Sequence, residues 1–349
     1  MARLVVALTG ALIVAVMLTV TPAASEPPAP KRDFDATPYL GPMQLVDIGG
    51  RRLNMYCVGT GSPTVVLEAG LGDDMATWRY VQPALAHRTR VCAYDRAGMG
   101  FSDFADTPRD AIAVTSDLRR LLRIGGVRPP YLMVGSSVGG LYALMFAERY
   151  QRDLAGLLLV DPAEFHTEDF RAVAPEVATE LAGVARQRAT CRERVRRGPF
   201  RPDAPDYNLC VPDSNEVEAA CAVGKPACAL AKLRTAHRAG VDYIIDLDSE
   251  QRSWCTRTAA EVLSRLKPLG SLPLIVLTGA KTFEPMSGVP EEQRIAAEAL
   301  WVQMHDRLAA LSSDGRNIIV SDAGHVIQTD DPQAIISATG NILDRLKKR

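Results

Sequence analysis

A Gly-x-Ser-x-Gly sequence centred on Ser137 lies directly between two apolar segments of different character. Residues 131–134 have the composition of a buried strand, and residues 141–147 have that of a helix packed on one side. So short a reversal forces Ser137 into a strained backbone conformation, and Gly135 and Gly139 lack the side chains that would collide there. The Ser137 hydroxyl is therefore expected at a helix N-terminus, where free N–H groups favour developing negative charge.

Length and composition limit the classes of protein that remain. The chain has 349 residues, of which 47% are hydrophobic, enough for one large core with an insertion or for two small domains. Its 40 basic and 41 acidic residues are interleaved and leave a formal net charge of -1. Nothing in this balance indicates a nucleic-acid partner, so we expect a neutral or apolar small-molecule substrate.

Residues 1–25 are typical of an export signal. A basic start precedes an apolar run over residues 4–20, and the small residues at 23–25 suit signal peptidase. The run is long for a signal and short for a spanning helix, so cleavage and retention as a membrane anchor both stay open. Residues 26–40 are interpreted as a Pro/Ala-rich linker. We expect a secreted or cell-envelope protein that associates with a membrane only if residues 4–20 are uncleaved.

The seven cysteines agree with export. Cys57 and Cys92 lie in two predicted strands, and the other five lie between residues 190 and 256. This second group has no histidine at metal spacing and no second close pair, so it predicts disulfides in a loop-rich insertion and no metal site. The odd total leaves at least one thiol unpaired within a monomer, and the sequence does not determine the pairing.

Two further motifs accompany the serine motif. The predicted strand at residues 90–94 leads into Tyr-Asp-Arg-Ala-Gly-x-Gly-x-Ser, ending at Ser102, and a Gly-His-x-Ile-Gln segment starts at Gly324. With the serine motif between them, the chain resembles the α/β-hydrolase family over residues 43–162 and 268–349. The resemblance makes Asp95 and Arg96 a structural pair that organises the loop beside the active site.

The resemblance implies an α/β fold with a mostly parallel eight-stranded sheet flanked by helices. The core would comprise residues 41–162 and 268–349, with a mainly helical cap inserted at residues 163–267. Residues 75–87 are expected to form one amphipathic helix. We interpret the basic run at 186–201 as a solvated face, because nearby acidic residues offset part of its charge.

In the family's sheet order, the strands that carry Cys57 and Cys92 are neighbours. A cross-strand disulfide and two buried thiols both stay open at this point.

The resemblance also implies where an oxyanion would bind. The loop after the strand at residues 63–68 supplies one backbone N–H in the family, which by position is that of Leu71, and the second is that of Val138. Ala69 stands where the family commonly has histidine, which leaves the backbone role unaffected.

A serine hydroxyl needs a base, and the base needs a third group to orient it. His325 alone of the five histidines follows a core strand before the last helix, which is where the family keeps its base. For the acid we assign Asp161, which ends the strand after the elbow helix, as in a variant of the family. Glu284 is the alternative, because the commoner position after the penultimate strand lacks an aspartate. Asp322 is too close to His325 along the chain.

These assignments predict a serine hydrolase, a carboxylesterase or a lipase-like enzyme, that acts on a small-molecule or lipid ester through an acyl-serine, with no metal or organic cofactor. The same fold also supports other serine chemistries, and four of these remain alternatives: peptidase, thioesterase and acyltransferase activity and the hydrolysis of carbon–carbon bonds. A non-catalytic binding module is the alternative from another class.

Overall fold

The computed structural model describes residues 34–105, 108–163, 167–212, 214–253 and 267–348. All of them belong to the second of two units into which contacts divide the chain, Asp33–Arg349. The predicted signal or anchor lies outside the described residues, as does most of the predicted linker. Within the described ranges, no helix has the length and apolarity needed to cross a membrane.

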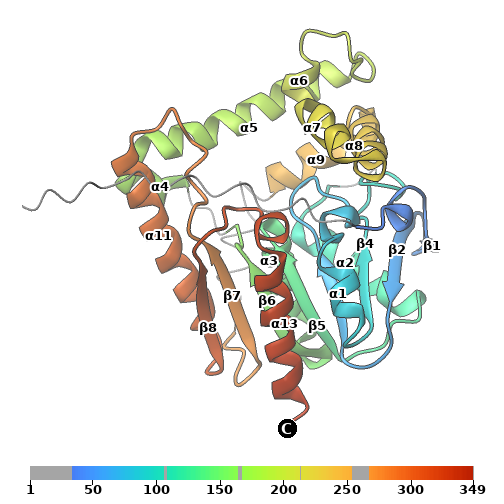
Figure 1. Ribbon diagram of the computed structural model, residues 1–349, viewed down its shortest axis with the longest axis vertical. Coiled ribbons are helices and arrows are strands. Elements are labelled where there is room, and N and C mark those ends of the chain that lie inside the picture. Colours follow the sequence, from blue (N-terminus) through green and yellow to red (C-terminus); the bar gives the residue numbers. More distant parts are fainter. Residues whose placement is uncertain (1–33, 106–107, 164–166, 213, 254–266, 349) are drawn as a thin grey trace, which may run out of the picture. The chain divides into compact units, whose positions relative to one another are not determined.

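One eight-stranded sheet forms the centre of the fold (Figure 1). Its spatial order is β1-β2-β4-β3-β5-β6-β7-β8. The first two strands form an antiparallel hairpin and β2 pairs antiparallel with β4, whereas all pairs from β4 to β8 are parallel. The strands are β1 (Gln44–Asp47), β2 (Arg52–Val58), β3 (Thr64–Glu68), β4 (Val91–Tyr94), β5 (Tyr131–Ser136), β6 (Leu154–Val160), β7 (Leu274–Gly279) and β8 (Gly315–Val320). The predicted mostly parallel sheet is confirmed.

Helices cover both faces of the sheet. Buried residues of α2, α3 and α11 pack on one face, and those of α1, α12 and α13 pack on the other. These helices are α1 (Gln82–Ala86), α2 (Ala111–Ile124), α3 (Val138–Tyr150), α11 (Glu291–Ala309), α12 (Ile327–Asp330) and α13 (Pro332–Leu346), with short 3-10 turns η1 (Thr37–Tyr39), η2 (Met75–Trp78) and η3 (Gln151–Asp153).

The central strands are mostly apolar because both of their faces are buried, and their buried polar residues lie at or near strand ends. In β5, Met133 belongs to the core cluster under α3, while Leu132 and Val134 belong to the cluster under α13. A strand between two helical layers buries the side chains on both of its faces, which explains why the sequence shows continuous apolar runs rather than alternation.

The single helix predicted over residues 75–87 is wrong. The structure has the 3-10 turn η2 (Met75–Trp78) followed by the separate short helix α1 (Gln82–Ala86). Pro83 lies in the first turn of α1, where its missing N–H costs nothing, whereas inside a continuous helix it would remove a hydrogen bond.

Between β6 and β7, the described residues form helices and no strand. They are α4 (Thr167–Val173), α5 (Pro175–Val195), α6 (Tyr207–Cys210), α7 (Val217–Val223), α8 (Lys225–Arg238) and α9 (Val241–Ser253), with the 3-10 turn η4 (Ser214–Glu216). We call this segment the cap. Its predicted limits at residues 163 and 267 border stretches outside the described residues and stay predictions.

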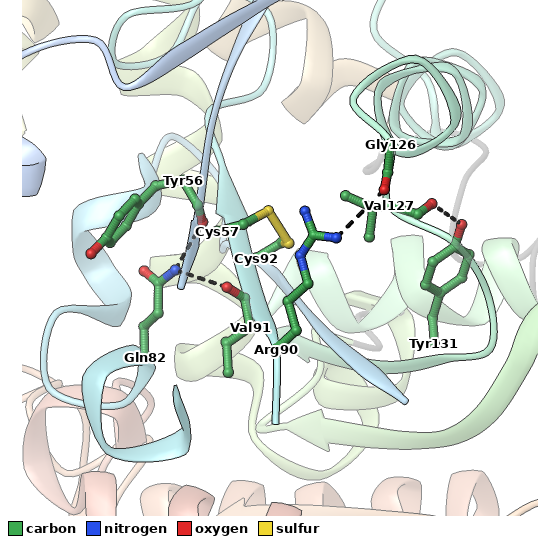
Figure 2. Close-up of a disulfide and its surroundings, with 9 residues drawn as sticks. All are labelled: Tyr56, Cys57, Gln82, Arg90, Val91, Cys92, Gly126, Val127 and Tyr131. Carbon is green, nitrogen blue, oxygen red and sulfur yellow. Dashed lines mark hydrogen bonds between the residues drawn. A yellow bond between two sulfur atoms is a disulfide. The ribbon is translucent and has the colours of Figure 1, made fainter. Parts of the chain in front are cut away.

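A disulfide between Cys57 and Cys92 joins β2 to β4 (Figure 2). The two residues are register partners in the antiparallel pair, which resolves the alternatives in favour of the cross-strand bond. The buried Gln82 of α1 reinforces this junction, because its amide donates to the carbonyl of Tyr56 at 2.9 Å and to that of Val91 at 3.4 Å.

Two more disulfides lie within the cap. Cys191 pairs with Cys210, and Cys221 pairs with Cys228. The predicted disulfides in the insertion are therefore present, and Cys255, the seventh cysteine, lies outside the described residues.

We predict that replacing Cys57 and Cys92 together by alanine lowers the free energy of unfolding by about 2–4 kcal/mol. The bond closes a loop with a sequence separation of 35 residues, so its loss restores chain entropy to the unfolded state. Urea unfolding followed by circular dichroism measures the change. The same double substitution at Cys221 and Cys228, which close a loop with a separation of only 7, serves as the comparison and should cost less. Equal losses for both pairs would contradict the loop-length argument.

Candidate active site

The turn between β5 and α3 holds Ser137 in a backbone conformation that few residues adopt. Its φ is 54° and its ψ is -125°. A Cβ on Gly135 would lie 2.3 Å from the carbonyl oxygen of Gly139, and a Cβ on Gly139 would lie 2.5 Å from the carbonyl oxygens of Glu68 and Ala69. No side chain fits at either position, so the two glycines of the motif permit the strained turn and its contact with the end of β3.

Three side chains from three chain segments form one hydrogen-bonded series. The Nε2 of His325 lies 2.9 Å from the Oγ of Ser137, and its Nδ1 lies 2.7 Å from Oδ2 of Asp161. A carboxylate only accepts, so Nδ1 carries the hydrogen and Nε2 is left to accept the Ser137 proton. The structure thus brings together the three residues that the sequence analysis selected as nucleophile, base and acid.

Asp161 is fully buried and receives four hydrogen bonds. Its Oδ1 accepts from the backbone N–H of Gly279 and from the indole N–H of Trp301, each at 2.9 Å. Its Oδ2 accepts from the Thr282 hydroxyl at 2.8 Å in addition to His325. These donors compensate the loss of water around the carboxylate and fix its direction toward His325.

Two opposing effects determine the pKa of His325. Burial lowers the pKa, whereas the hydrogen bond and the negative charge of Asp161 raise it, and the result lies above the ordinary value of 6.5. Asp73 and Asp330 add smaller contributions in the same direction as Asp161. The imidazolium form is therefore stabilised relative to a histidine in water.

Glu284, the alternative acid, does not join this group. Its side chain is exposed, and among the described residues no hydrogen bond links it to His325. The Glu284 carbonyl oxygen accepts from Arg294 at 2.9 Å.

His305 on α11 is a different case, because it is buried close to the acid. Its Nε2 lies 3.0 Å from the carbonyl oxygen of Pro162 and its Nδ1 lies 2.7 Å from the Thr278 hydroxyl. Burial lowers the pKa of His305, although Asp161, 4.0 Å away, raises it. His305 thus packs beneath Asp161 and does not contact Ser137.

The two predicted oxyanion donors lie beside Ser137. Val138 begins α3 directly after the serine, and the loop that carries Leu71 passes so close that a Cβ on Gly70 would lie 3.5 Å from the Cβ of Ser137. Within the described part of the chain, neither the Leu71 nor the Val138 N–H donates to a protein acceptor. Unpaired N–H groups next to a nucleophile are what an oxyanion requires.

A cavity of about 930 Å³ opens over Ser137 and His325. Its core side includes Gly70 and Leu71, and the cap contributes residues of α4, α5 and α9. The cap wall combines apolar, cationic and other polar side chains, which are Leu181, Ala182, Val184, Ala185, Arg171, Arg186, Arg188, Asp169 and Gln251.

The basic run of the cap therefore divides into two parts. Arg186 and Arg188 line the cavity. Four later members pair with acidic side chains: Arg192 with Asp248 and Glu193, Arg194 with Asp206, Arg196 with Glu193, and Arg201 with Asp203. The predicted solvated face holds for the exposed pairs Arg196–Glu193 and Arg201–Asp203 and for the exposed Arg186, which also borders the cavity, whereas Arg188 is half-buried in the cavity wall.

Asp95 and Arg96 each have a structural role, but they are not a pair. Asp95 accepts from the Asn54 amide and the Met75 N–H at 2.8 Å and from the Phe101 N–H at 3.1 Å. The Arg96 guanidinium instead binds buried carboxylates elsewhere. Adjacent residues of an extended segment point to opposite sides, so neighbours in sequence have different partners.

Sequence reasoning missed the residues that support Asp161. Trp301 lies 140 residues away on α11, and Thr282 follows β7 by three residues. Only Thr282 had a detectable signal, because polar residues just after a parallel strand gather at the same edge of the sheet. Nothing in the sequence distinguishes Trp301 from an ordinary core tryptophan.

A family model described as the alpha/beta hydrolase family matches residues 65–338. The chain belongs to the alpha/beta hydrolase family, which confirms the resemblance inferred from its motifs.

Relatives and solved structures agree with this assignment. An uncharacterized Bacillus subtilis protein, YqjL, is 22% identical over 79% of this chain and 82% of its own length. An AB hydrolase superfamily protein of Gibberella zeae is 32% identical over 35% of this chain and 39% of its own length.

Two enzymes have similar folds. A thermophilic esterase from Thermogutta terrifontis has a TM-score of 0.58 at 21% identity, over 85% of this chain and 94% of that one. The enol-lactonase from Burkholderia xenovorans LB400 has a TM-score of 0.55 at 20% identity, over 84% of this chain and 97% of that one. At such identities the likeness shows the fold.

We predict that His325 titrates above 6.5 and that Asp161→Asn lowers its pKa below that of the wild-type protein. Asparagine removes the charge that stabilises the imidazolium while burial, which favours the neutral ring, persists. An NMR titration of isotope-labelled histidine, assigned with His325→Gln, measures both values. Asp322→Asn is the matched control, because Asp322 is 92% exposed and pairs with Lys281. An unchanged His325 pKa in Asp161→Asn would contradict the electrostatic role of Asp161.

Proposed function

We propose that this protein is an exported serine hydrolase that cleaves a carboxylic ester through an acyl-serine intermediate. The observation that carries the proposal is the hydrogen-bonded series from Ser137 through His325 to Asp161, at 2.9 and 2.7 Å. Its geometry fits the roles of nucleophile, general base and orienting acid.

In the first step, Nε2 of His325 accepts the proton of the Ser137 hydroxyl as the Oγ attacks the carbonyl carbon of the ester. The carbonyl oxygen becomes an oxyanion, which the N–H groups of Leu71 and Val138 are placed to bind. Asp161 stabilises the imidazolium that forms, in keeping with the raised pKa of His325.

The tetrahedral intermediate then collapses. The bond to the alcohol oxygen breaks, and His325 returns its proton to the leaving alcohol. A water molecule, deprotonated by the same imidazole, attacks the acyl-serine, and a second collapse releases the carboxylic acid and restores Ser137. Every proton transfer passes through Nε2 of His325.

The cavity supports a small-molecule or lipid ester as substrate. Its volume of about 930 Å³ lies at the upper end of the range for small-molecule sites, and Leu181, Val184 and Ala185 give its cap wall apolar surface. The Thermogutta esterase of similar fold is consistent with ester chemistry, although the likeness itself concerns the fold.

Export is supported by the disulfides. Three are present among the described residues, and disulfides persist mainly in oxidising compartments. The signal-like residues 1–25 would direct the chain there.

We predict that the purified protein hydrolyses p-nitrophenyl butyrate and that Ser137→Ala reduces the rate to background. Asp161→Asn should lower kcat by about 10²–10⁴, because the imidazole loses the partner that fixes its tautomer and stabilises its charge. Initial rates at saturating substrate measure these changes.

Glu284→Gln is the control for the choice of acid and should leave kcat within about twofold, since the Glu284 side chain is exposed and has no hydrogen bond to His325 among the described residues. If Glu284→Gln were as damaging as Asp161→Asn, the assignment of the acid would be wrong. Full activity of Ser137→Ala would reject the serine mechanism.

A further inference from the structure

The loop of residues 69–74 carries Leu71, one of the two proposed oxyanion donors. The loop leaves the end of β3 and passes beside Ser137, as the placement of Gly70 shows. A loop supplies a useful oxyanion donor only if its N–H is held in one direction before the substrate arrives. Contacts from the core residue Arg96 and from the cap helices α8 and α9 both hold this loop.

Arg96 binds the two carbonyl groups that precede Leu71. Its guanidinium is 1% exposed and donates to the carbonyl oxygen of Ala69 at 2.8 Å and to that of Gly70 at 2.6 Å, which also accepts from the Asp73 N–H at 3.2 Å. The carbonyl of Gly70 and the N–H of Leu71 belong to one planar trans peptide group and point in opposite directions. By holding the Gly70 oxygen, Arg96 therefore directs the Leu71 N–H away from itself.

The guanidinium in turn is fixed by two buried carboxylates. Glu250 of cap helix α9 accepts from Arg96 at 2.9 and 3.1 Å, and Glu68 at the end of β3 accepts at 2.9 Å. Burial raises the pKa of Glu68 to about 7, against the effect of Arg96. Glu250 is 0% exposed, so this bidentate pair joins the cap to the loop away from solvent.

Helix α9 holds the loop at a second point. The Tyr243 hydroxyl donates to the carbonyl oxygen of Gly72 at 3.0 Å. Gly72 has a φ of +74°, and a Cβ there would lie 2.7 Å from the Tyr243 hydroxyl and 2.9 Å from Leu247. The helix packs so closely on Gly72 that the loop has no room to move toward it.

Helix α8 holds the end of the loop through charge pairs. Arg234 and Arg238 donate to Oδ1 of Asp73 at 3.1 and 2.9 Å, and Arg234 also donates to Asp74 at 2.8 Å. Asp74 caps the following turn by accepting from the Ala76 N–H at 3.0 Å. Hydrogen bonds or ion pairs thus hold most of the loop of residues 69–74. They bind the carbonyl groups of residues 69, 70 and 72 and the side chains of Asp73 and Asp74.

We propose that cap helices α8 and α9 position the oxyanion loop, with Tyr243 and the Arg96–Glu250 pair as positioning residues for the reaction. This inference rests on the proposed function. The cap then acts in the chemical step, in addition to lining the cavity, because α9 holds Arg96 on one side of Leu71 and the Gly72 carbonyl on the other.

The test compares Tyr243→Phe with Tyr131→Phe. Both remove a buried hydroxyl that donates to a backbone carbonyl, and the Tyr131 bond, to Val127 at 2.8 Å, lies at the far end of β5 (Figure 2). Each loss costs about 1 kcal/mol of stability, so the variants are matched in that respect. Glu250→Gln is a second variant, which keeps the shape of the side chain and removes its charge.

With p-nitrophenyl butyrate, Tyr243→Phe should lower kcat by about tenfold with KM within twofold, because the oxyanion forms only after binding. Inhibition by a trifluoromethyl ketone, which forms a tetrahedral adduct, should weaken by the same factor as kcat/KM falls. Glu250→Gln should act in the same direction, and Tyr131→Phe should leave both quantities unchanged. Equal effects of Tyr243→Phe and Tyr131→Phe would overturn the proposal.

Amide hydrogen exchange of residues 69–76 gives a readout that does not need activity. Exchange should be faster in Tyr243→Phe and Glu250→Gln than in the wild-type protein and Tyr131→Phe. Unchanged exchange, or faster exchange with unchanged kcat, would reject the positioning role. If the wild-type protein neither hydrolyses the ester nor reacts with the ketone, the proposed function fails, while the exchange result still decides whether the cap holds the loop.

Discussion

The strained turn at Ser137 is the constraint on which the rest of the site depends. A residue held at a φ of 54° costs about 1–3 kcal/mol, which the surrounding sheet must offset. The Ser137 N–H donates to the carbonyl of Val160 at 2.9 Å, so the turn is bonded to the last residue of β6, directly before Asp161. Asp161 itself has a φ of 42°, and its N–H donates to Leu277 of the next strand. Two strained residues are thus held by the same parallel ladder.

Burial of Asp161 connects this geometry to the electrostatics. A buried carboxylate is stable only with hydrogen bonds that replace water, and the donors from Gly279, Trp301 and Thr282 supply them. The remaining bond, to His325, orients the imidazole toward Ser137. The same logic recurs at Arg96, whose buried charge is matched by two carboxylates and two carbonyl groups.

The sequence was sufficient where a local rule determines the structure. The elbow at Ser137 and the individual strands follow from short motifs and apolar runs, whereas the order of the strands came from the family resemblance. Pro83 shows that one local signal was overlooked in predicting a helix over residues 75–87. Contacts between distant segments leave no such signal. Trp301 and Glu250 lie on helices whose sequences satisfy ordinary packing, and only the folded chain brings them to Asp161 and Arg96. The choice between Asp161 and Glu284 likewise required the distance to His325.

The most direct test of the catalytic role of Ser137 is to treat the protein with a fluorophosphonate and locate the adduct by peptide mass spectrometry. We expect one phosphonylated residue, Ser137, with loss of fluoride, no adduct in Ser137→Ala, and slower labelling in Asp161→Asn. A folded wild-type protein without an adduct, or an adduct on a different serine, would contradict the claim that the Ser137, His325 and Asp161 series is a working catalytic centre.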